Sequence, residues 1–559
     1  MQHKATLQII VLFLLTTISL LSYADEQELT TDTSSLTQAT VSMSFEEAAA
    51  QLAEKVNFSQ QETNLDRLAT YDDERVYNIL FAFSENTLFY VKETKELVSA
   101  INVGDSYRVT SMLTGKILDI TSKSSLKKVK SKNSLRGKAS EYVAVLGMKS
   151  PNVKIRKNAV YDVVKNVDES AYLKLQKLSA TEPDTEVLEY IHVGMAMWEI
   201  ESTDRDKRLK AIATLSNSLI PEVRVKLAVL VKKNEAGEFV EPDETIRRAA
   251  QRALDIIDER IGFFGFLDNV VFGLSLGSVL LLIAIGLAIT FGVMGVINMA
   301  HGELMMIGAY TAYVVQQIMP SYIGVSVFVA IPLAFLVSAM FGIAIERFVI
   351  RYMYGRPLET LLATFGISLM LQQLVRVIFG PTNQAVETPP FMSGSWEINP
   401  VFAITYNRLY IFIFSIMVLL ALIYILKRTR LGLQVRAVSQ NRAIAKAMGV
   451  RSEWVDALTF GLGAGIAGIA GVALSQLTNV GPNLGQGYII DSFMVVVFGG
   501  VGNLWGTFVA AMSLGVISKF MEPWAGAVLA KILVLVFIIL FIQKRPRGLF
   551  PQKGRAAES

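Results

Sequence analysis

The sequence predicts a mainly α-helical protein, in which a polytopic membrane domain of about nine spans follows an exported soluble region. Two observations lead to this prediction. Apolar runs of about 20 residues, the length that crosses a bilayer, recur from position 263 onward. The residues before 263 mix charged and apolar types as soluble domains do, so the overall hydrophobic fraction of 52% averages two different halves. A chain of 559 residues is also too long for one ordinary domain.

The sequence predicts a signal peptide over residues 1–24. His3 and Lys4 precede an apolar stretch from Leu7 to Leu21, and Ser22-Tyr23-Ala24 then supplies a small-x-small cleavage site. The alternative is an uncleaved membrane anchor, for which the apolar stretch is short. Cleavage would place the following residues outside the cytoplasm, and a chain without cysteine fits a bacterial periplasm.

Residue types that bind metals or act as nucleophiles are scarce in this chain. It has no cysteine, which excludes disulfides, thiolate catalysis and cysteine-ligated metals. The three histidines, His3, His192 and His301, are scattered through the sequence. We therefore predict no metal site and no cofactor.

Residues 25–149 predict a periplasmic α/β region that begins with a flexible leader, 25–42. Ser44, with Glu47 three positions later, predicts a capped helix over 44–56. Alternating β-branched runs with turn signals between them predict strands from Arg75 to about Ile120. The basic stretch Lys123–Lys138 lacks interleaved aromatic residues and is interpreted as a solvated linker, so no nucleic-acid partner is expected.

Residues 150–262 predict a helical region with a weak internal repeat. The stretches 151–156, 221–226 and 244–250 each begin with proline or an acidic residue and continue with alternating apolar and basic residues. This resembles HEAT-like repeats, in which each helix pair buries one face on the next pair. A plain helical domain is the alternative.

Residues 263–543 predict the membrane domain. Lys and Arg, which mark the cytoplasmic side, are concentrated after the third and fifth spans and in the tail 544–559, and are absent from 380–407 and 476–487. An exported amino terminus and a cytoplasmic tail require an odd number of spans, which favours nine over eight. The spans are 266–290, 302–318, 322–345, 359–379, 408–426, 454–476, 488–502, 503–519 and 526–543.

The stretch 295–310 is the first candidate for a transport pathway. It carries Asn298, His301 and Glu303 inside an apolar run, where polar and ionisable groups are costly and are usually packed or used. Gly295 and Gly302 allow a span to break or backbones to approach closely. We predict a substrate path at this break.

A second stretch, 500–506, has a similar pattern. Its residues Gly500-Val501-Gly502-Asn503 loosely match Gly295-Val296-Ile297-Asn298. Two such breaks in corresponding places of inverted repeats indicate a path near the midplane of the membrane, to which Gly502 and Asn503 would contribute. Ordinary packing of small residues is the alternative, and His301 and Glu303 would then hold the first break in place.

The basic connection 427–453 contains a short predicted helix, 441–448. Asn441 begins it, Gly449 follows its end as a C-cap, and the small side chains of Ala443, Ala445 and Ala447 leave room for close contact. Such a helix suits docking into a groove of another protein. An electrostatic contact with membrane lipid is the alternative.

Several of these stretches resemble the permeases of branched-chain amino-acid-type ABC importers. The resemblance covers about 264–552 and rests on INMAHGE (297–303), QNRAIAKAMGV (440–450) and VFGGVGNLWGTFVAA (497–511). The exported extension resembles the urea ABC transporter permease, the UrtB type. The resemblance therefore implies an importer of urea or a short-chain amide, with a branched-chain amino acid as the alternative.

The resemblance also implies partners and a location in the bacterial inner membrane. The chain would pair with a second permease, two cytoplasmic ATPases and a periplasmic solute-binding protein, and residues 441–449 would be the coupling helix on the ATPase. The chain would not be an enzyme, and it contains no GxxxxGK[ST] motif. A passive urea channel and a membrane-anchored sensor are rivals from other classes.

Urea and an amino acid would need different sites. Urea, a neutral solute, needs amide and hydroxyl partners, such as Asn298 and Asn503, more than it needs ions. An amino-acid zwitterion would use a helix amino terminus for its carboxylate and an acid such as Glu303 for its ammonium group.

Overall fold

A computed structural model describes residues 43–550 apart from 55, 72, 104, 105 and 236. The chain divides into two compact units between Ser150 and Pro151, next to the predicted boundary at 149. The predicted signal peptide, the leader and positions 551–559 of the tail lie outside the described residues.

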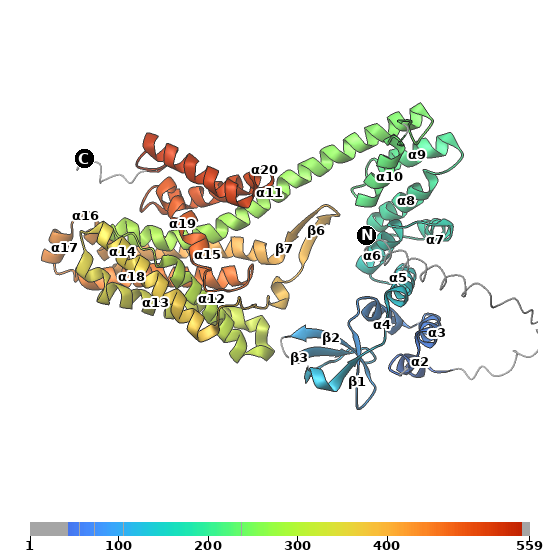
Figure 1. Ribbon diagram of the computed structural model, residues 1–559, viewed down its shortest axis with the longest axis horizontal. Helices are drawn as coiled ribbons and strands as arrows, with labels where there is room; N and C mark the ends of the chain where they lie inside the picture. Colours follow the sequence, from blue (N-terminus) through green and yellow to red (C-terminus); the bar gives the residue numbers. More distant parts are fainter. Residues whose placement is uncertain (1–42, 55, 72, 104–105, 236, 551–559) are drawn as a thin grey trace, which may run out of the picture. The chain divides into compact units, whose positions relative to one another are not determined.

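The first unit is an α/β domain (Figure 1). Its sheet is antiparallel with the strand order β4-β3-β2-β1-β5, and the helices share an apolar core with β1 and β2. Ser44 and Glu47 form the expected capping box. The elements are α2 (Phe45–Gln51), α3 (Phe58–Leu68), α4 (Glu74–Ser84), β1 (Leu88–Val91), β2 (Leu97–Val103), β3 (Ser106–Ser111), β4 (Ile117–Ser122), β5 (Leu126–Lys128) and α5 (Asn133–Gly147).

Two expectations for this unit were wrong. Residues 74–84 form a helix rather than a strand, because Val76, Ile79, Leu80 and Phe83 lie on one helical face and are buried. The stretch 123–138 is not a linker, because it contains β5, which pairs with β1, and the start of α5. Its many lysines lower the mean hydropathy of the stretch, which is why the sequence pattern indicated a solvated linker.

The second unit begins with helices in which one contact recurs. Arg156, four residues into α6, bonds Glu182, and Arg208, four residues into α9, bonds Glu241. Each glutamate starts a Glu-Pro-Asp sequence whose aspartate caps the next helix. This recurrence supports the HEAT-like assignment, which stays a prediction. The helices are α6 (Val153–Val164), α7 (Glu169–Ser179), α8 (Thr185–Glu199), α9 (Arg205–Leu215) and α10 (Pro221–Val231).

The long helix α11 (Glu244–Met294) runs from this array into the apolar domain, so no break in secondary structure marks the expected boundary at 262. The apolar domain continues with α12 (His301–Ile318), α13 (Ile323–Phe348), α14 (Pro357–Phe379), the hairpin β6 (Ser395–Asn399) and β7 (Phe402–Thr405), α15 (Tyr406–Arg428), α16 (Arg430–Gln440), α17 (Arg442–Ala447), α18 (Ser452–Ser475), α19 (Gln486–Gly499) and α20 (Leu504–Lys544).

Six helices in the described part of the chain are long and apolar enough to cross a membrane: α11, α13, α14, α15, α18 and α20. The predicted span 302–318 is α12, and 488–502 corresponds to the shorter α19. Two predicted spans fall in α20, which is interrupted at Gly526, where φ is +74°. The protein is therefore a polytopic helical membrane protein, and the number nine stays a prediction.

Glycines bring these helices into contact. A Cβ atom on Gly308 of α12 would lie 2.1 Å from the carbonyl oxygen of Gly468 in α18, and one on Gly286 of α11 would lie 2.5 Å from that of Gly463. The backbones can approach this closely only because these positions lack side chains. Small-residue packing is thus the main principle of this bundle.

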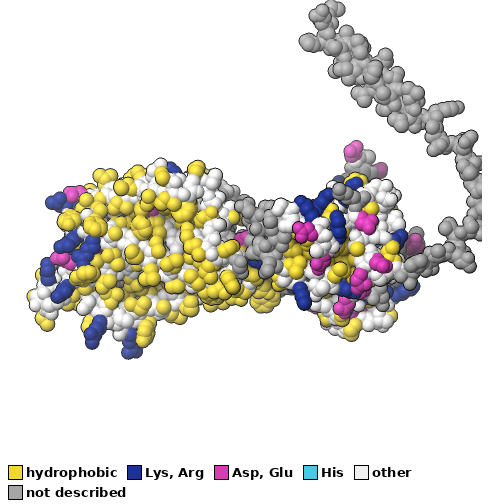
Figure 2. Space-filling view, turned by 90° about the horizontal axis from the view of Figure 1, so that it is seen from below, with side chains coloured by type: hydrophobic (Ala, Val, Ile, Leu, Met, Phe, Trp, Pro, Cys, Tyr) yellow, Lys and Arg dark blue, Asp and Glu magenta, His cyan; other side chains and the backbone are white. Residues whose placement is uncertain are grey.

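Figure 2 shows an apolar side surface on this domain, with Lys and Arg gathered at one end. Figure 1 places α16 and α17 at that end. An apolar side surface with a basic end is what a membrane domain requires, because lipid contacts its sides.

Candidate functional site

The first predicted break is present. Helix α11 ends at Met294, Gly295 adopts the left-handed conformation with φ of +67°, and α12 begins at His301. A left-handed residue at this place favours glycine and ends the helix. Asn298, His301 and Glu303 are all buried beside the resulting non-helical segment.

His301 ties the two sides of this break together. Its Nε2 lies 3.0 Å from the carbonyl oxygen of Ile283 in α11, so Nε2 donates the hydrogen bond. A Cβ on Gly286 would lie 2.9 Å from the imidazole, so that glycine makes room for the ring. His301 therefore acts as a structural lock between α11 and α12.

Glu303 faces helix α14. Its Oε1 accepts hydrogen bonds from Ser368 Oγ at 3.0 Å and from Gln372 Nε2 at 2.7 Å. Its Oε2 is buried and has no hydrogen-bond partner among the residues that the structure describes. An unmatched polar atom in an apolar bundle is costly, so this oxygen is available for a further donor.

Asn298 caps the turn before α12. Its Oδ1 accepts from the backbone N–H of Ala300 at 3.0 Å, and its Nδ2 is a buried donor without a partner in the described residues. The neighbouring Met299 N–H donates to Thr364 Oγ1 at 3.1 Å. Among the described residues the break thus holds one unused donor, on Asn298, and two unused acceptors, Oε2 of Glu303 and Nδ1 of His301.

The second predicted break is also present, but its contacts differ. Helix α19 ends at Gly499, Gly500 and Gly502 have φ of +104° and +79°, and α20 begins at Leu504. Asn503 caps α20 through its Oδ1, and its Nδ2 donates to the Phe550 carbonyl at 3.1 Å. The chain end covers this break, since Leu549 and Phe550 donate to the carbonyls of Phe498 and Gly499.

The end of α11 packs against the second break. A Cβ on Gly292, in the last turn of α11, would lie 2.6 Å from the Cα of Gly502. A cavity of about 320 Å³ opens here, lined by Gly292, Gly502 and Asn503 and by the cations Lys427 and Arg436. Asn298 and Asn503 bond different partners, and no hydrogen bond joins them in the described structure.

The predicted docking helix is α17, one residue shorter at each end than expected. Asn441 caps it through its side chain, and Gly449 follows with φ of +86°. Ala445 is buried against α16 and α18, so it does not belong to the accessible face on which the sequence analysis placed it. That face carries Ala443 and Ala447 and also Ile444 and Met448, whose exposed fractions are 61% and 80%.

Comparison with known proteins decides the family. The branched-chain amino acid transport system / permease component family matches residues 269–542. The high-affinity branched-chain amino acid transport system permease protein BraD of Pseudomonas aeruginosa is 30% identical over 295 residues, which are 51% of this chain and 96% of BraD. The chain belongs to the branched-chain amino acid permease family.

Two further relatives have names from the same kind of transport system. The permease protein LivH of Salmonella typhimurium is 30% identical to this permease over 297 residues, 51% of the chain and 96% of LivH. The permease protein LivM of the same bacterium is 24% identical over 296 residues, 48% of the chain and 67% of LivM. No solved structure matches the chain. The permease is thus a multi-pass transport subunit of the inner membrane.

The sequence analysis missed the partners of Glu303 in the permease. Helix α14 carries polar residues at every fourth position: Thr360, Thr364, Ser368, Gln372 and Arg376. The middle three bond residues of the first break and the start of α12. The first four are buried, and Arg376 bonds Asn483 in the α18–α19 loop at 2.6 Å. The spacing of four within an apolar span was the signal, since it places all five on one helical stripe.

A charged network attaches α17 to the permease bundle. Arg442, the first residue of α17, forms an ion pair with the buried Asp456 of α18 and lies 4.5 Å from the ring centre of Tyr354. The Tyr354 hydroxyl donates to the buried Glu346 of α13 at 3.2 Å. A displacement of α17 would therefore pull on both α13 and α18.

Proposed function

We propose that the chain is the membrane-spanning permease subunit of an ATP-driven importer, and that its solute is a branched-chain amino acid. The main support is the similarity of the helical domain, with both breaks, to BraD and LivH, of which it covers 96% each. The names of both relatives give that substrate. The basic end of the domain would face the cytoplasm, as Lys and Arg do in membrane proteins. This orientation agrees with an importer whose residues 25–262 lie in the periplasm and whose tail lies in the cytoplasm.

The solute path would run along the breaks. Asn298 and Glu303 each keep one unused buried polar atom beside the first break, and a cavity opens between the last turn of α11, at Gly292, and the second break, at Gly502. Non-helical backbone at membrane depth is tolerated where it lines such a cavity. We assign Gly295, Asn298, Gly302 and Glu303 to this path, with His301 as its lock and with Gly502 and Asn503 at its second break.

The partners would be a second related permease, two ATPase subunits and a solute-binding protein. The chain is similar to both LivH and LivM, two permease proteins of one bacterium, which supports pairing of related permeases. The exposed side chains of α17 would contact the ATPase. The ion pair between Arg442 and Asp456 would then pass ATPase closure to the bundle, which changes between two states.

Urea or a short-chain amide is the second candidate. The relatives correspond to about half of this chain, so the exported region before residue 269 distinguishes it from them. The neutral hydroxyl and amide groups of the α14 stripe would also suit an uncharged solute. The comparisons favour the amino acid, because neither the family description nor these relatives' names mention urea.

Uptake by cells that lack the chromosomal copy and carry this chain on a plasmid tests the function. We expect ATP-dependent uptake of radiolabelled leucine, isoleucine or valine, which unlabelled urea does not inhibit. Uptake of labelled urea instead would identify the second candidate. Uptake that continues after ATP depletion would exclude an importer and indicate a channel.

The coupling role of α17 needs a separate variant. Met448→Asp places a charge on the exposed face and should abolish uptake without removing the protein from the membrane. Ala447→Ser is the matched mild change on the same face. Normal uptake by Met448→Asp would exclude α17 as the ATPase contact.

A further inference from the structure

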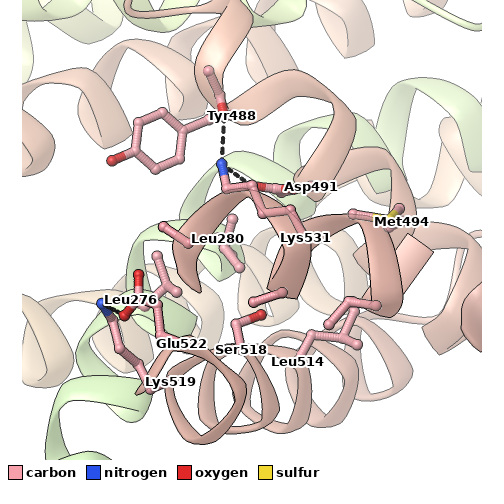
Figure 3. A pocket seen from close by; sticks show the side chains of 14 residues that line it. Leu276, Leu280, Tyr488, Asp491, Met494, Leu514, Ser518, Lys519, Glu522 and Lys531 are labelled. Atoms are coloured by element: carbon pink, nitrogen blue, oxygen red, sulfur yellow. Dashed lines mark hydrogen bonds and ion pairs between the residues drawn. The ribbon is translucent and has the colours of Figure 1, made fainter. Parts of the chain in front are cut away.

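A second cavity lies between α11, α19 and the two parts of α20 (Figure 3). Its volume is about 330 Å³, within the range of about 300–1,000 Å³ of small-molecule sites. Two ion pairs lie at its wall: Lys531 with Asp491, at 3.1 Å, and Lys519 with Glu522. It is thus a cavity with two positive and two negative groups.

The interruption of α20 builds this cavity. Pro523 and the non-helical Gly526 divide the helix, so that its second part packs beside α19. Lys531 thereby comes from α20 to Asp491 of α19, two residues 40 positions apart. Without the interruption, a continuous helix would carry Lys531 away from α19.

One of the two ion pairs of this cavity lies inside segments predicted to span the membrane. Asp491 belongs to the predicted span 488–502 and Lys531 to 526–543. The Asp491 side chain is 17% exposed and that of Lys531 is 57% exposed. Exposed charges within a span are costly in lipid, so this face of the domain meets water or a polar molecule.

The rest of the cavity wall is aliphatic. Leu276 and Leu280 come from α11, Met494 from α19, and Leu514 and Val534 from α20. Figure 3 shows Leu276, Leu280, Met494 and Leu514 together with both ion pairs. A ligand in this cavity would therefore meet charges of both signs and an aliphatic surface.

We propose that this cavity binds a zwitterionic amino acid with an aliphatic side chain during its passage through the permease. Lys531 and Lys519 receive its carboxylate, Asp491 and Glu522 receive its ammonium group, and the leucines and Val534 contact its side chain. The proposal rests on the function proposed above and extends it, because it names the charged residues that select the substrate.

The other ligand classes fit the cavity less well. Urea carries no charge and would leave both ion pairs without a role. An anion alone would also meet the carboxylates of Asp491 and Glu522, each of which is paired with one of the lysines. The ion pair of Lys531 is half exposed, so it is weakly held and exchanges its partner at low cost.

Photocrosslinking of the full-length chain, purified with its membrane lipids, tests the site. The probe is the diazirine analogue of leucine, which keeps the zwitterion. We expect adducts on peptides that contain Met494, Leu514 or Val534, and we expect excess leucine but not urea to remove them. Adducts that leucine does not displace, or adducts only elsewhere, would overturn the proposal.

A double variant separates binding from structure. Asp491→Leu with Lys531→Met removes both charges of one pair without leaving either unpaired, so the fold should persist. We expect adducts at the cavity to fall at least about tenfold, equivalent to ~1.4 kcal/mol of binding free energy. Lys544→Met, in the same helix outside the cavity, should change nothing. Unchanged labelling in the double variant would show that the pair is only structural.

The cellular uptake experiment distinguishes the two proposals. ATP-dependent leucine uptake that survives the double variant would disprove this site and keep the proposed function. Uptake of urea alone by the unmodified chain would disprove the amino-acid function, and with it this proposal.

Discussion

The two breaks of the bundle have similar sequences and different surroundings. At the first, Asn298, His301 and Glu303 are buried and bond α11, α12 and α14. At the second, Asn503 faces a cavity, and the end of the chain covers the break through three backbone-directed hydrogen bonds. The first break is held by polar side chains inside the bundle, and the second by the chain terminus.

This difference shows that a repeated glycine and asparagine pattern specifies a backbone conformation and does not specify a role. In both patterns glycine permits the left-handed turn that ends one helix. Asn503 then caps α20, whereas Asn298 accepts a backbone hydrogen bond in the turn before α12. The partners of each asparagine depend on the elements folded against it. Four predictions test how far the two breaks differ.

The largest effect is expected at Gly302. A Cβ at this position would lie 2.5 Å from the Gly485 carbonyl oxygen, a backbone atom that cannot move independently. Gly302→Val should therefore cost roughly 3 kcal/mol or more of the free energy of unfolding and abolish uptake. Thermal unfolding of the purified protein measures this cost.

Gly295→Ala is the matched control at the same break. No atom lies within 4 Å of the added Cβ, so only the left-handed conformation is strained, at about 1–2 kcal/mol. A Gly302→Val protein as stable as Gly295→Ala would show that the break does not depend on close packing.

The next effect concerns the asparagines. Asn298→Leu should reduce uptake about tenfold, corresponding to ~1.4 kcal/mol, because it removes the buried unused donor and the hydrogen bond to the Ala300 N–H in the turn before α12. Asn503→Leu should reduce uptake less, since its contacts are a helix cap and the chain end. Equal losses of initial uptake rate would contradict the difference between the breaks.

Two variants of Glu303 test whether uptake needs the charge of this side chain or only its hydrogen bonds. Glu303→Gln keeps an acceptor for Ser368 and Gln372 and should preserve uptake, whereas Glu303→Ala leaves both donors unmatched at a cost of about 1–3 kcal/mol. Uptake and unfolding temperature should decrease together in Glu303→Ala. Loss of uptake by a fully stable Glu303→Gln protein would show that the charge itself is used.

The smallest effect is expected at the chain end. Gly548 has φ of +73°, and a Cβ there would lie 2.7 Å from the Cα of Gly500. Gly548→Ala should release the end from the second break and increase amide hydrogen exchange at Leu549 and Phe550, with little change in unfolding temperature. Unchanged protection of these two amides would mean that the end is held by other contacts.

Much of the fold could be predicted from local patterns. The apolar runs, the capping box at Ser44 and both helix breaks need only side-chain type and spacing, and the structure confirms them. The helix at 74–84 was misassigned because its nearly continuous run of apolar and aromatic residues conceals the helical stripe. The elements within 123–138 were misassigned because lysines separate their few apolar residues.

Most contacts of the candidate site could not be predicted in this way. Glu303 meets Ser368 and Gln372 across about 65 positions, and Lys531 meets Asp491 only because Gly526 interrupts α20. Ala445 shows the opposite error, since its small size suggested an accessible face although it faces the interior. Contacts between distant elements depend on how helices pack.

The sequence alone determined that this protein is a helical membrane permease, since hydropathy, glycine breaks and family motifs are properties of short segments. Only the tertiary structure decided which polar groups share a site. Glycine-to-glycine contacts set the distances between helices, and those distances decide whether a buried side chain finds a partner, covers a break or lines a cavity.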